Sequence, residues 1–437
     1  MSIITTSAAR TPQVASATVR WLSAIVFAVV VLAVLAPRGT VLWLPVLALA
    51  GLLAHWYLER APSLPVSADP VTLAFLAFAA YCAANALWSL APNVALAKVA
   101  TLAAGILATS LMVRVIERQS DSNLIFLARA LAIGTVIGTF FIFIEVLSDL
   151  SVWRTACTAL TALCPSPKHM VLDAGVVKRI NPYNLNRNVG ALNLVLWPGL
   201  LAIAAWPAGR VKVAVAACCV YALALVATLR SEHETSMVAI LASAAIFALC
   251  RFAPRLGRAV ALAGWTAATL LVVPVALVAY DARLYCAPAL PSTAQARIVL
   301  WGYTAKEVIK NPLFGVGVNS TPEIDESLKA EAKPPEACAP YPSRTGQHSH
   351  NIYMQSWFEL GLAGVLFLYG AGFMAWRSLC RLPTDVQPFA FATATSAMCV
   401  AAFSWGMWQA WYLYLFALAA ILLSLAARWA IRRPMAN

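Results

Sequence analysis

Two histidines, His348 and His350, follow a long polar segment and directly precede a new apolar run. The polar segment covers residues 281–347 and lies between two long hydrophobic stretches. Histidine is the side chain whose ordinary pKa lies closest to neutral pH, so at such a boundary it can exchange a proton with a substrate. We therefore expect the chemistry of this chain at the junction between the polar segment and the apolar run.

Cations at the ends of other apolar runs form a second group of candidate residues. Lys98, Arg187 and Arg230 stand beside short loops, where a positive charge is costly unless an anion accompanies it. Asparagines, Asn186 among them, surround Arg187, and their side chains suit either backbone groups at a helix start or oxygen atoms of a ligand. These residues favour binding of an anionic ligand, with ordinary interfacial charges as the alternative. For the turn after Arg230, a salt-bridged structural role is equally consistent.

The composition predicts an all-α, polytopic membrane protein. Hydrophobic residues make up 62% of the 437 residues and charged residues only 11%, more apolar surface than a soluble core absorbs. A helix needs about 20 apolar residues to cross a hydrocarbon layer of about 30 Å. About twelve segments satisfy this requirement: 21–36, 41–58, 71–90, 94–113, 124–147, 189–206, 211–229, 236–250, 259–280, 351–376, 389–405 and 408–429.

The distribution of Lys and Arg predicts the orientation of these spans. We expect a single transmembrane domain over residues 1–437, with its first apolar run retained as a helix and both termini in the cytoplasm. A large loop at residues 281–349 and a smaller one at residues 148–188 then lie outside. The net charge of +13 suits anionic ligands, although anionic lipid headgroups also explain it.

The large loop has local order of its own. Helical spacing of apolar residues predicts a short helix over 294–309, which Asn311-Pro312 ends. A second, polar helix is predicted from Thr321 to about Lys333. The acidic side chains of this region have no partner at metal-ligand spacing and are interpreted as solvated surface; they are Glu323, Asp325, Glu326 and Glu331.

Four cysteines fall in the two long loops. Cys157 with Cys164, and Cys286 with Cys338, can each close a loop in an oxidising compartment such as a bacterial periplasm. Four cysteines allow three connectivities, so the sequence leaves the pairing open.

Several elements, taken in order, resemble the family of O-antigen ligases and polymerases. They are Trp88-Ser89, Lys98 soon after it, Arg297 four residues before Trp301, the segment Asn311-Pro312-Leu313-Phe314-Gly315-Val316-Gly317, and His350-Asn351 followed by Gly361-x2-Gly364. The resemblance covers most of the chain. It departs from the family at Ser231-Glu232-His233-Glu234, where many relatives have Ser-Arg-Gly, and this weakens the transfer of a family role to Arg230.

The resemblance implies a GT-C-like fold and transfer of a glycan from undecaprenyl diphosphate to a hydroxyl of lipid A-core, on the periplasmic face of the bacterial inner membrane. His350 would be the base, with His348 as the competing candidate, and Asn351 would orient it or a sugar hydroxyl. Arg187 and Arg297 would hold the leaving diphosphate. The residues expected to bind substrate are Lys98, Asn186, Arg230, Trp301, His348 and Asn351.

One base and one displacement imply inversion at the anomeric carbon. We expect no metal and no cofactor, because cations of the chain would hold the diphosphate, and no nucleic acid partner. Three other functions share features of this sequence. An O-antigen polymerase and a protein O-oligosaccharyltransferase use the same donor chemistry, and a secondary transporter also has about twelve spans, but with related halves.

Overall fold

Helices build almost the whole structure. The computed structural model describes residues 17–59, 68–160, 164–339 and 341–432. The helices in the described part are α1 (Ala17–Leu35), α2 (Thr40–Glu59), α3 (Pro70–Asn85), α4 (Pro92–Glu117), α5 (Asp121–Leu147), α6 (Ser151–Ala159), α7 (Asn186–Ala204), α8 (Arg210–Arg230), α9 (Glu234–Phe252), α10 (Pro254–Leu270), α11 (Val272–Asp281), α12 (Ser292–Lys310), α13 (Thr321–Leu328), α14 (Ile352–Leu379), α15 (Gln387–Phe403) and α16 (Ala410–Arg432). The two chain termini lie outside the described residues, so their predicted cytoplasmic location stays a prediction.

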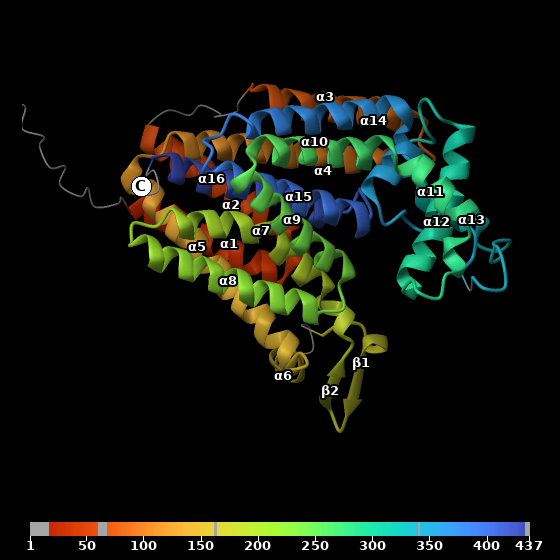
Figure 1. Cartoon of the computed structure of the whole chain (residues 1–437), viewed down its shortest axis with the longest axis horizontal. Helices are drawn as coiled ribbons and strands as arrows, with labels where there is room; N and C mark the ends of the chain where they lie inside the picture. The colour runs from red at the N-terminus through yellow and green to blue at the C-terminus, as the bar shows by residue number, and fades with distance from the viewer. Residues whose placement is uncertain (1–16, 60–67, 161–163, 340, 433–437) are drawn as a thin grey trace, which may run out of the picture.

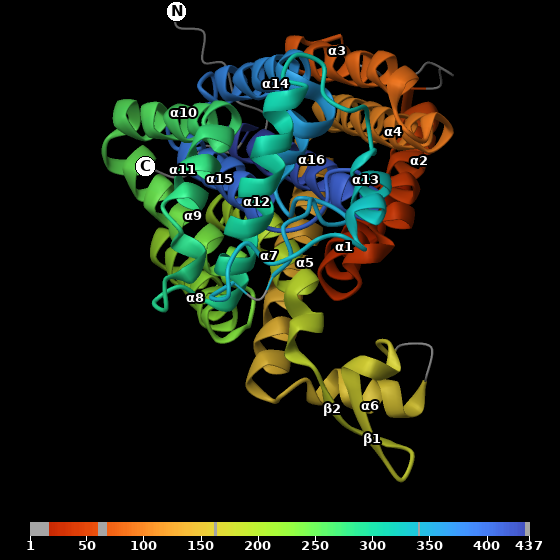
Figure 2. The ribbon, with the colours of Figure 1, turned by 90° about the vertical axis from the view of Figure 1, so that its right-hand side faces the viewer.

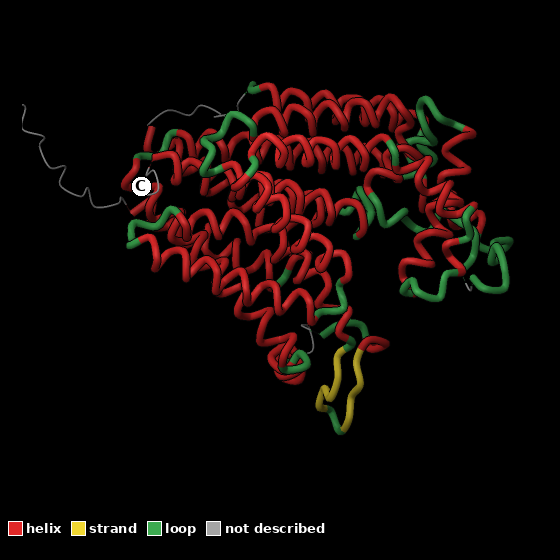
Figure 3. Tube along the Cα trace, in the orientation of Figure 1, coloured by secondary structure: helices red, strands yellow, loops and turns green. Residues whose placement is uncertain are grey.

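The prediction of an all-α, polytopic membrane protein is confirmed. Ten described helices are long and apolar enough to cross a membrane, or eleven if the bent pair α10 and α11 counts as one span. The remaining predicted segment, 389–405, corresponds to α15, which is apolar but has only 17 residues. The helices run roughly parallel, as Figure 1 shows, and Figure 3 shows how little of the trace is strand.

The predicted span 259–280 is not one straight helix. It consists of α10 and α11, which meet at Leu271 with a bend of 66°. Pro274 has no N–H with which to continue the hydrogen bonding of α10, and this accounts for a break at that point. After the bend α11 packs against α12, and α10 and α11 together line a cavity with α9, α12 and α15.

Both long loops lie at one end of the bundle, which we call the loop end. It carries α12 and α13, and also α6 with the antiparallel strands β1 (Met170–Asp173) and β2 (Val176–Ile180). Viewed from this end, α12 and α13 cover the bundle, whereas α6 and the two strands project from its edge (Figure 2). The strands were not predicted, because Ala174-Gly175 makes a tight turn with positive φ at both residues inside a short stretch of mixed polarity.

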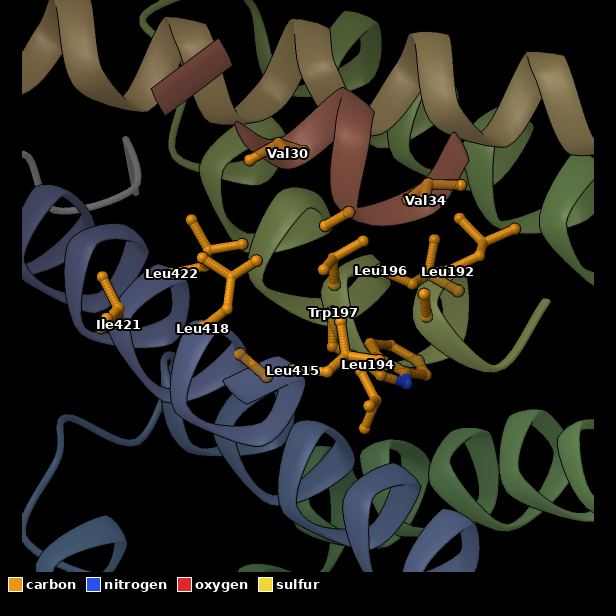
Figure 4. Packing of buried hydrophobic residues seen from close by; sticks show 14 of the residues in the cluster. Val30, Val34, Leu192, Leu194, Leu196, Trp197, Leu415, Leu418, Ile421 and Leu422 are labelled. Atoms are coloured by element: carbon orange, nitrogen blue, oxygen red, sulfur yellow. The ribbon is translucent and has the colours of Figure 1, made fainter. Parts of the chain in front are cut away.

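Helix α7 forms the centre of the core. Its span is 89% buried, and Figure 4 shows its side chains Leu192, Leu196 and Trp197 among residues of α1 and α16. Asn188, in the first turn of α7, donates from Nδ2 to the carbonyls of Val34 and Leu35 at the end of α1, at 2.8 Å each. These bonds fix the start of α7 at the loop end.

The large loop follows the prediction in outline. The first predicted helix is α12, slightly longer than expected, whereas the second is α13 and ends at Leu328 rather than near Lys333. Cys286 and Cys338 form the expected disulfide, with their Cα atoms 5.3 Å apart. This bond joins the segment after α11 to the segment after α13, so α12 is enclosed by a covalent loop.

The possible disulfide between Cys157 and Cys164 is not formed in the structure. Both are free cysteines, and Cys157 is buried on α6. The Sγ of Cys164 lies 3.4 Å from the backbone carbonyl of Cys157.

The glycine-rich segment 311–318 packs against a kink in α14. Gly361 has φ 65° and ψ −172°, which interrupts the helix. Backbone bonds then run between the two segments: Val316 N donates to Phe358 O at 3.1 Å, and Leu362 N donates to Pro312 O at 2.8 Å. A Cβ at Gly361 would come within 2.5 Å of the backbone of Leu313.

Helix α3 and the turn after it hold the other side of this segment. Asn85 Nδ2 donates to Phe314 O at 2.8 Å, and Asn85 Oδ1 accepts from Val318 N at 2.8 Å. Ser89 Oγ donates to Val318 O at 2.7 Å. Gly317 has φ 99°, and a Cβ there would lie 2.5 Å from Ser89 Cα. The Trp-Ser turn, the Gly-x-Gly segment and the Gly-x2-Gly element of the sequence therefore form one structural unit.

Replacing Gly361 by alanine tests this unit. The left-handed backbone and the contact with Leu313 predict that Gly361→Ala lowers the stability of the folded state by about 2–4 kcal/mol, measured as a lower midpoint of thermal unfolding in detergent. Gly370→Ala is the matched control on the same helix, because nothing lies within 4 Å of a Cβ at that position. Equal midpoints for the two variants would contradict the proposed role of the kink.

Candidate active site

His350 lies at the loop end, in the last turn of chain before α14. It has φ 52°, a left-handed conformation that is uncommon for a residue with a side chain. The ring is half-buried, and its Nδ1 lies 2.7 Å from the backbone carbonyl of Ser404, which follows α15. Strained backbone and a fixed ring are typical of a residue that is held in place for a function.

The contact with Ser404 fixes which ring nitrogen carries the proton. A carbonyl oxygen only accepts, so Nδ1–H of His350 must donate to it, and Nε2 then has a free lone pair in the neutral ring. Burial lowers the pKa of His350, with the charge of Arg297 acting in the same direction and the carbonyl of Ser404 opposing them. The ring is therefore neutral at pH 7 and can accept a proton at Nε2.

Arg297 on α12 provides the positive charge of the site. Its charge acts on both His350 and His233, so it lies near both rings. Burial lowers the pKa of the guanidinium and nearby Glu234 raises it, but the group stays protonated at neutral pH. No carboxylate of the described residues lies within ion-pair distance of Arg297. A half-buried guanidinium without an ion pair is suited to an anionic substrate.

His233 is a functional candidate that the sequence did not reveal. It precedes α9, is only 6% exposed, and packs against Trp405 with ring centroids 5.3 Å apart. Its Nδ1 lies 2.6 Å from Ser236 Oγ. Burial, assisted by Arg297, lowers the pKa of His233 to about 3, so this ring is neutral too. Two neutral histidines thus flank Arg297.

The segment 403–408, which consists of the last residue of α15 and most of the linker to α16, connects these groups. Phe403 O accepts from Thr235 Oγ1 at 2.9 Å, Ser404 O accepts from His350, and Met407 N donates to Gln355 Oε1 at 2.9 Å. The sequence interpretation placed most of this segment in two transmembrane spans. The hydrogen bonds of this segment come chiefly from its backbone groups, and no residue type in the sequence indicates such bonds.

The structure places His348 and Trp301 next to the segment that carries His350. The rings of His348 and His350 have centroids 4.2 Å apart. Nε2 of His348 is buried without a hydrogen-bond partner among the described residues, and burial lowers the pKa of this ring to about 4. Trp301 donates from Nε1 to the carbonyl of Ser349 at 2.6 Å, so it positions the histidine segment.

Asn351 has a structural function, and its predicted role toward the substrate stays a prediction. It caps α14, because its Oδ1 accepts from Met354 N at 3.0 Å. It also lines, with Trp301, a cavity of about 530 Å³ between α9, α10, α11, α12 and α15. The cavity walls are almost entirely apolar, with residues such as Ala268, Val272 and Met398.

Unlike Arg297, the other cations that the sequence analysis selected are not shown beside His350. Arg187 at the start of α7 has Arg38 and Tyr183, and not Arg297, as the groups whose charges act on it. Arg230 is exposed at the end of α8. Lys98 is half-buried on α4, two turns before Gly105, which faces Tyr414 of α16. Binding of one diphosphate by both Arg187 and Arg297 therefore stays a prediction.

The sequence analysis interpreted the acidic side chains of α13 and the segment after it as solvated surface, but one of them is buried. Asp325 is fully buried and accepts from Arg344 at 2.9 Å, so that prediction was wrong for this residue. Within the described ranges, one group of three metal-ligand types is close together, Cys286, Glu336 and Cys338. The disulfide already uses both of its sulfurs.

The proton position on His350 can be measured. We predict that ring-labelled histidine shows a neutral, Nδ1-protonated signal for His350 at pH 7 in long-range ¹⁵N–¹H spectra, because Ser404 O accepts that proton. Its loss in His350→Gln assigns the signal. A lowered pKa means that the ring gains a second proton only as the pH falls below the ordinary value of about 6.5. An Nε2-protonated or a doubly protonated ring at pH 7 would contradict the assignment.

Comparison with known proteins identifies the domain that holds this site. Residues 219–369 match a family model described as O-antigen ligase. The match runs from α8 into α14 and includes His233, Arg297 and His350, while Lys98 and Arg187 lie before it. No curated protein matches the chain. The match supports glycosyl transfer of the O-antigen ligase or polymerase type. The chain is thus a multi-pass membrane protein whose residues 219–369 match the O-antigen ligase family.

Proposed function

We propose that this protein transfers a glycan from undecaprenyl diphosphate to a sugar hydroxyl of lipid A-core. The reaction would take place at the loop end, on the periplasmic face of the bacterial inner membrane, with both termini in the cytoplasm. One observation carries the proposal: Ser404 O holds Nδ1 of the neutral His350, which leaves Nε2 free, and Arg297 is near enough for its charge to act on the same ring. A base beside a cation suits transfer from a diphosphate donor.

The transfer is a single displacement. The acceptor hydroxyl oxygen attacks the anomeric carbon, and its proton passes to His350 Nε2. The bond between that carbon and the diphosphate oxygen breaks, and its electron pair leaves with the diphosphate. Attack from the side opposite the leaving group inverts the anomeric carbon. Ser404 O stabilises the resulting imidazolium, because it accepts from Nδ1–H.

Arg297 stabilises the charge that the diphosphate gains. Its fork of N–H donors matches phosphate oxygens, and partial burial strengthens the attraction by excluding water. We propose that this guanidinium takes the place of a divalent cation, so transfer is independent of metal. A carboxylate partner would compete with the substrate, and the absence of one within ion-pair distance among the described residues leaves the group available.

The apolar cavity under α12 fits the isoprenoid of the donor. It extends from Ile246 and Ala261, inside the bundle, to Trp301 and Asn351 at the site. An isoprenoid placed there would bring its diphosphate to the level of Arg297, because Arg297 and Trp301 are separated by about one turn of α12. Trp301 would contact the first isoprene units or a sugar face.

A transfer assay tests the proposed function. With labelled undecaprenyl diphosphate glycan and lipid A-core, we expect the purified protein to form product in the presence of EDTA. His350→Gln should lower kcat by a factor of about 10²–10⁴, the usual contribution of a general base. Arg297→Lys should retain part of the activity and Arg297→Gln very little, because lysine keeps the charge but not the fork.

The outcomes of this assay separate the alternatives. Folding of each variant is checked by its thermal midpoint, so loss of activity is not confused with loss of structure. Elongation of the lipid-linked glycan instead of transfer to lipid A-core would assign the protein as a polymerase, and transfer to a Ser or Thr side chain as a protein O-oligosaccharyltransferase. No transfer to any acceptor would contradict the proposal and reopen the transporter hypothesis.

A further inference from the structure

A second pair of cations, Arg38 and Arg187, lies at the loop end outside the site described above. Arg38 belongs to a short turn, Pro37–Gly39, that connects α1 and α2. Arg187 is the second residue of α7. Arg38 is close enough for its charge to act on Arg187, and the bonds from Asn188 to the end of α1 hold the two segments together.

The two guanidiniums repel each other, and no acid of the described residues compensates them. No carboxylate in the described part of the chain lies within ion-pair distance of either side chain. The other group that acts on Arg187 is Tyr183, which brings no carboxylate. Two like charges held together by a rigid backbone are unfavourable, and an anion bound between them would remove that cost.

This pair is close to the site but distinct from it. Gly190, one turn after Arg187 on α7, faces the ring of Trp405 at 3.0 Å and His233 at 3.5 Å from a built Cβ. Trp405 therefore connects the neighbourhood of Arg187 with that of Arg297. The two cations have different charged or titratable neighbours: Glu234 acts on Arg297, whereas Arg38 and Tyr183 act on Arg187. Each cation group can thus hold a different anion.

The position of Arg38 indicates that the anion belongs to a membrane lipid. The helix that follows it, α2, exposes a row of apolar side chains, including Leu42 at 61%, Val46 at 49% and Leu49 at 57%. Such a row on a membrane-spanning helix faces acyl chains. A guanidinium at the end of that row lies at headgroup depth, where the phosphates of lipids are found.

We propose that Arg38 and Arg187 form a second anion site, which binds a phosphate group of the acceptor glycolipid. This proposal rests on the proposed function in one respect: Arg297 holds the diphosphate of the donor, so the second lipid substrate must be the acceptor. The side-chain oxygen of Asn186 is buried and has no partner among the described residues, so it can accept from a hydroxyl of the same headgroup. The proposal assigns Arg187 to the acceptor, whereas the sequence assigned it to the donor.

Transfer kinetics with two acceptors test the site. We expect Arg38→Gln and Arg187→Gln to raise the KM for phosphorylated lipid A-core about tenfold or more, because each loses charge-assisted hydrogen bonds. The KM for the donor should not change. With dephosphorylated lipid A-core, the wild type should already show the raised KM, and the substitutions should add nothing. Arg179→Gln is the charge-matched control, because Arg179 is exposed on β2 at the same end. A raised donor KM, or equal effects with both acceptors, would overturn the proposal.

A binding measurement separates this proposal from the proposed function. Wild type and variants in nanodiscs are titrated with phosphorylated and dephosphorylated lipid A. Loss of binding in Arg38→Gln and Arg187→Gln, only for the phosphorylated lipid, supports the site even if no transfer is found. Inorganic phosphate alone should not raise the thermal midpoint of the wild type above that of the variants. If it does so as strongly as the lipid, the site binds free phosphate and the assignment to a lipid is wrong.

Discussion

The carboxylate of Glu359 is the interaction on which the loop end depends. It is fully buried in α14 and accepts from Asn319 N, from the backbone and hydroxyl groups of Thr321, from Gln355 Nε2 and from Trp408 Nε1. An acid buried in a membrane-spanning helix is unfavourable unless donors surround it. Those donors come from α14, from Asn319 and the first residue of α13, and from the linker between α15 and α16, so satisfying one carboxylate fixes three parts of the chain around the site.

Hydrogen bonds connect the buried carboxylate of Glu359 with the segment that orients His350. Gln355 donates to Glu359 and accepts from Met407 N, which ties the segment 403–408 to α14. Ser404 lies in that segment, and its carbonyl orients the imidazole of His350. The bonds from Asn85 and Ser89 to the glycine-rich segment hold the other side. These bonds hold the backbone around His350 in place, as the proposed catalysis by preorganised groups would require.

Residue types and their periodicity made the helices, the two loops and the neighbourhood of His350 predictable. The Asn-Pro after α12 and the start of α14 after Asn351 have strong local signals. Groups placed only by tertiary contacts were not predictable: a carbonyl such as that of Ser404 leaves no trace in the sequence, and His233 lies in a turn whose acidic neighbours suggested a salt bridge. The partners of Arg187 and Arg297 were likewise hidden, because guanidiniums at helix ends look alike until packing separates them.

The most direct test of the account is a cryo-EM structure of the His350→Gln protein with undecaprenyl diphosphate glycan and lipid A-core, a combination in which slow transfer preserves both substrates. The account predicts the diphosphate on Arg297, the isoprenoid in the cavity under α12, and the acceptor hydroxyl within hydrogen-bond distance of residue 350. A diphosphate bound elsewhere, or an acceptor hydroxyl facing another base such as His348 or His233, would contradict the assignment of His350 and Arg297 to one reaction centre.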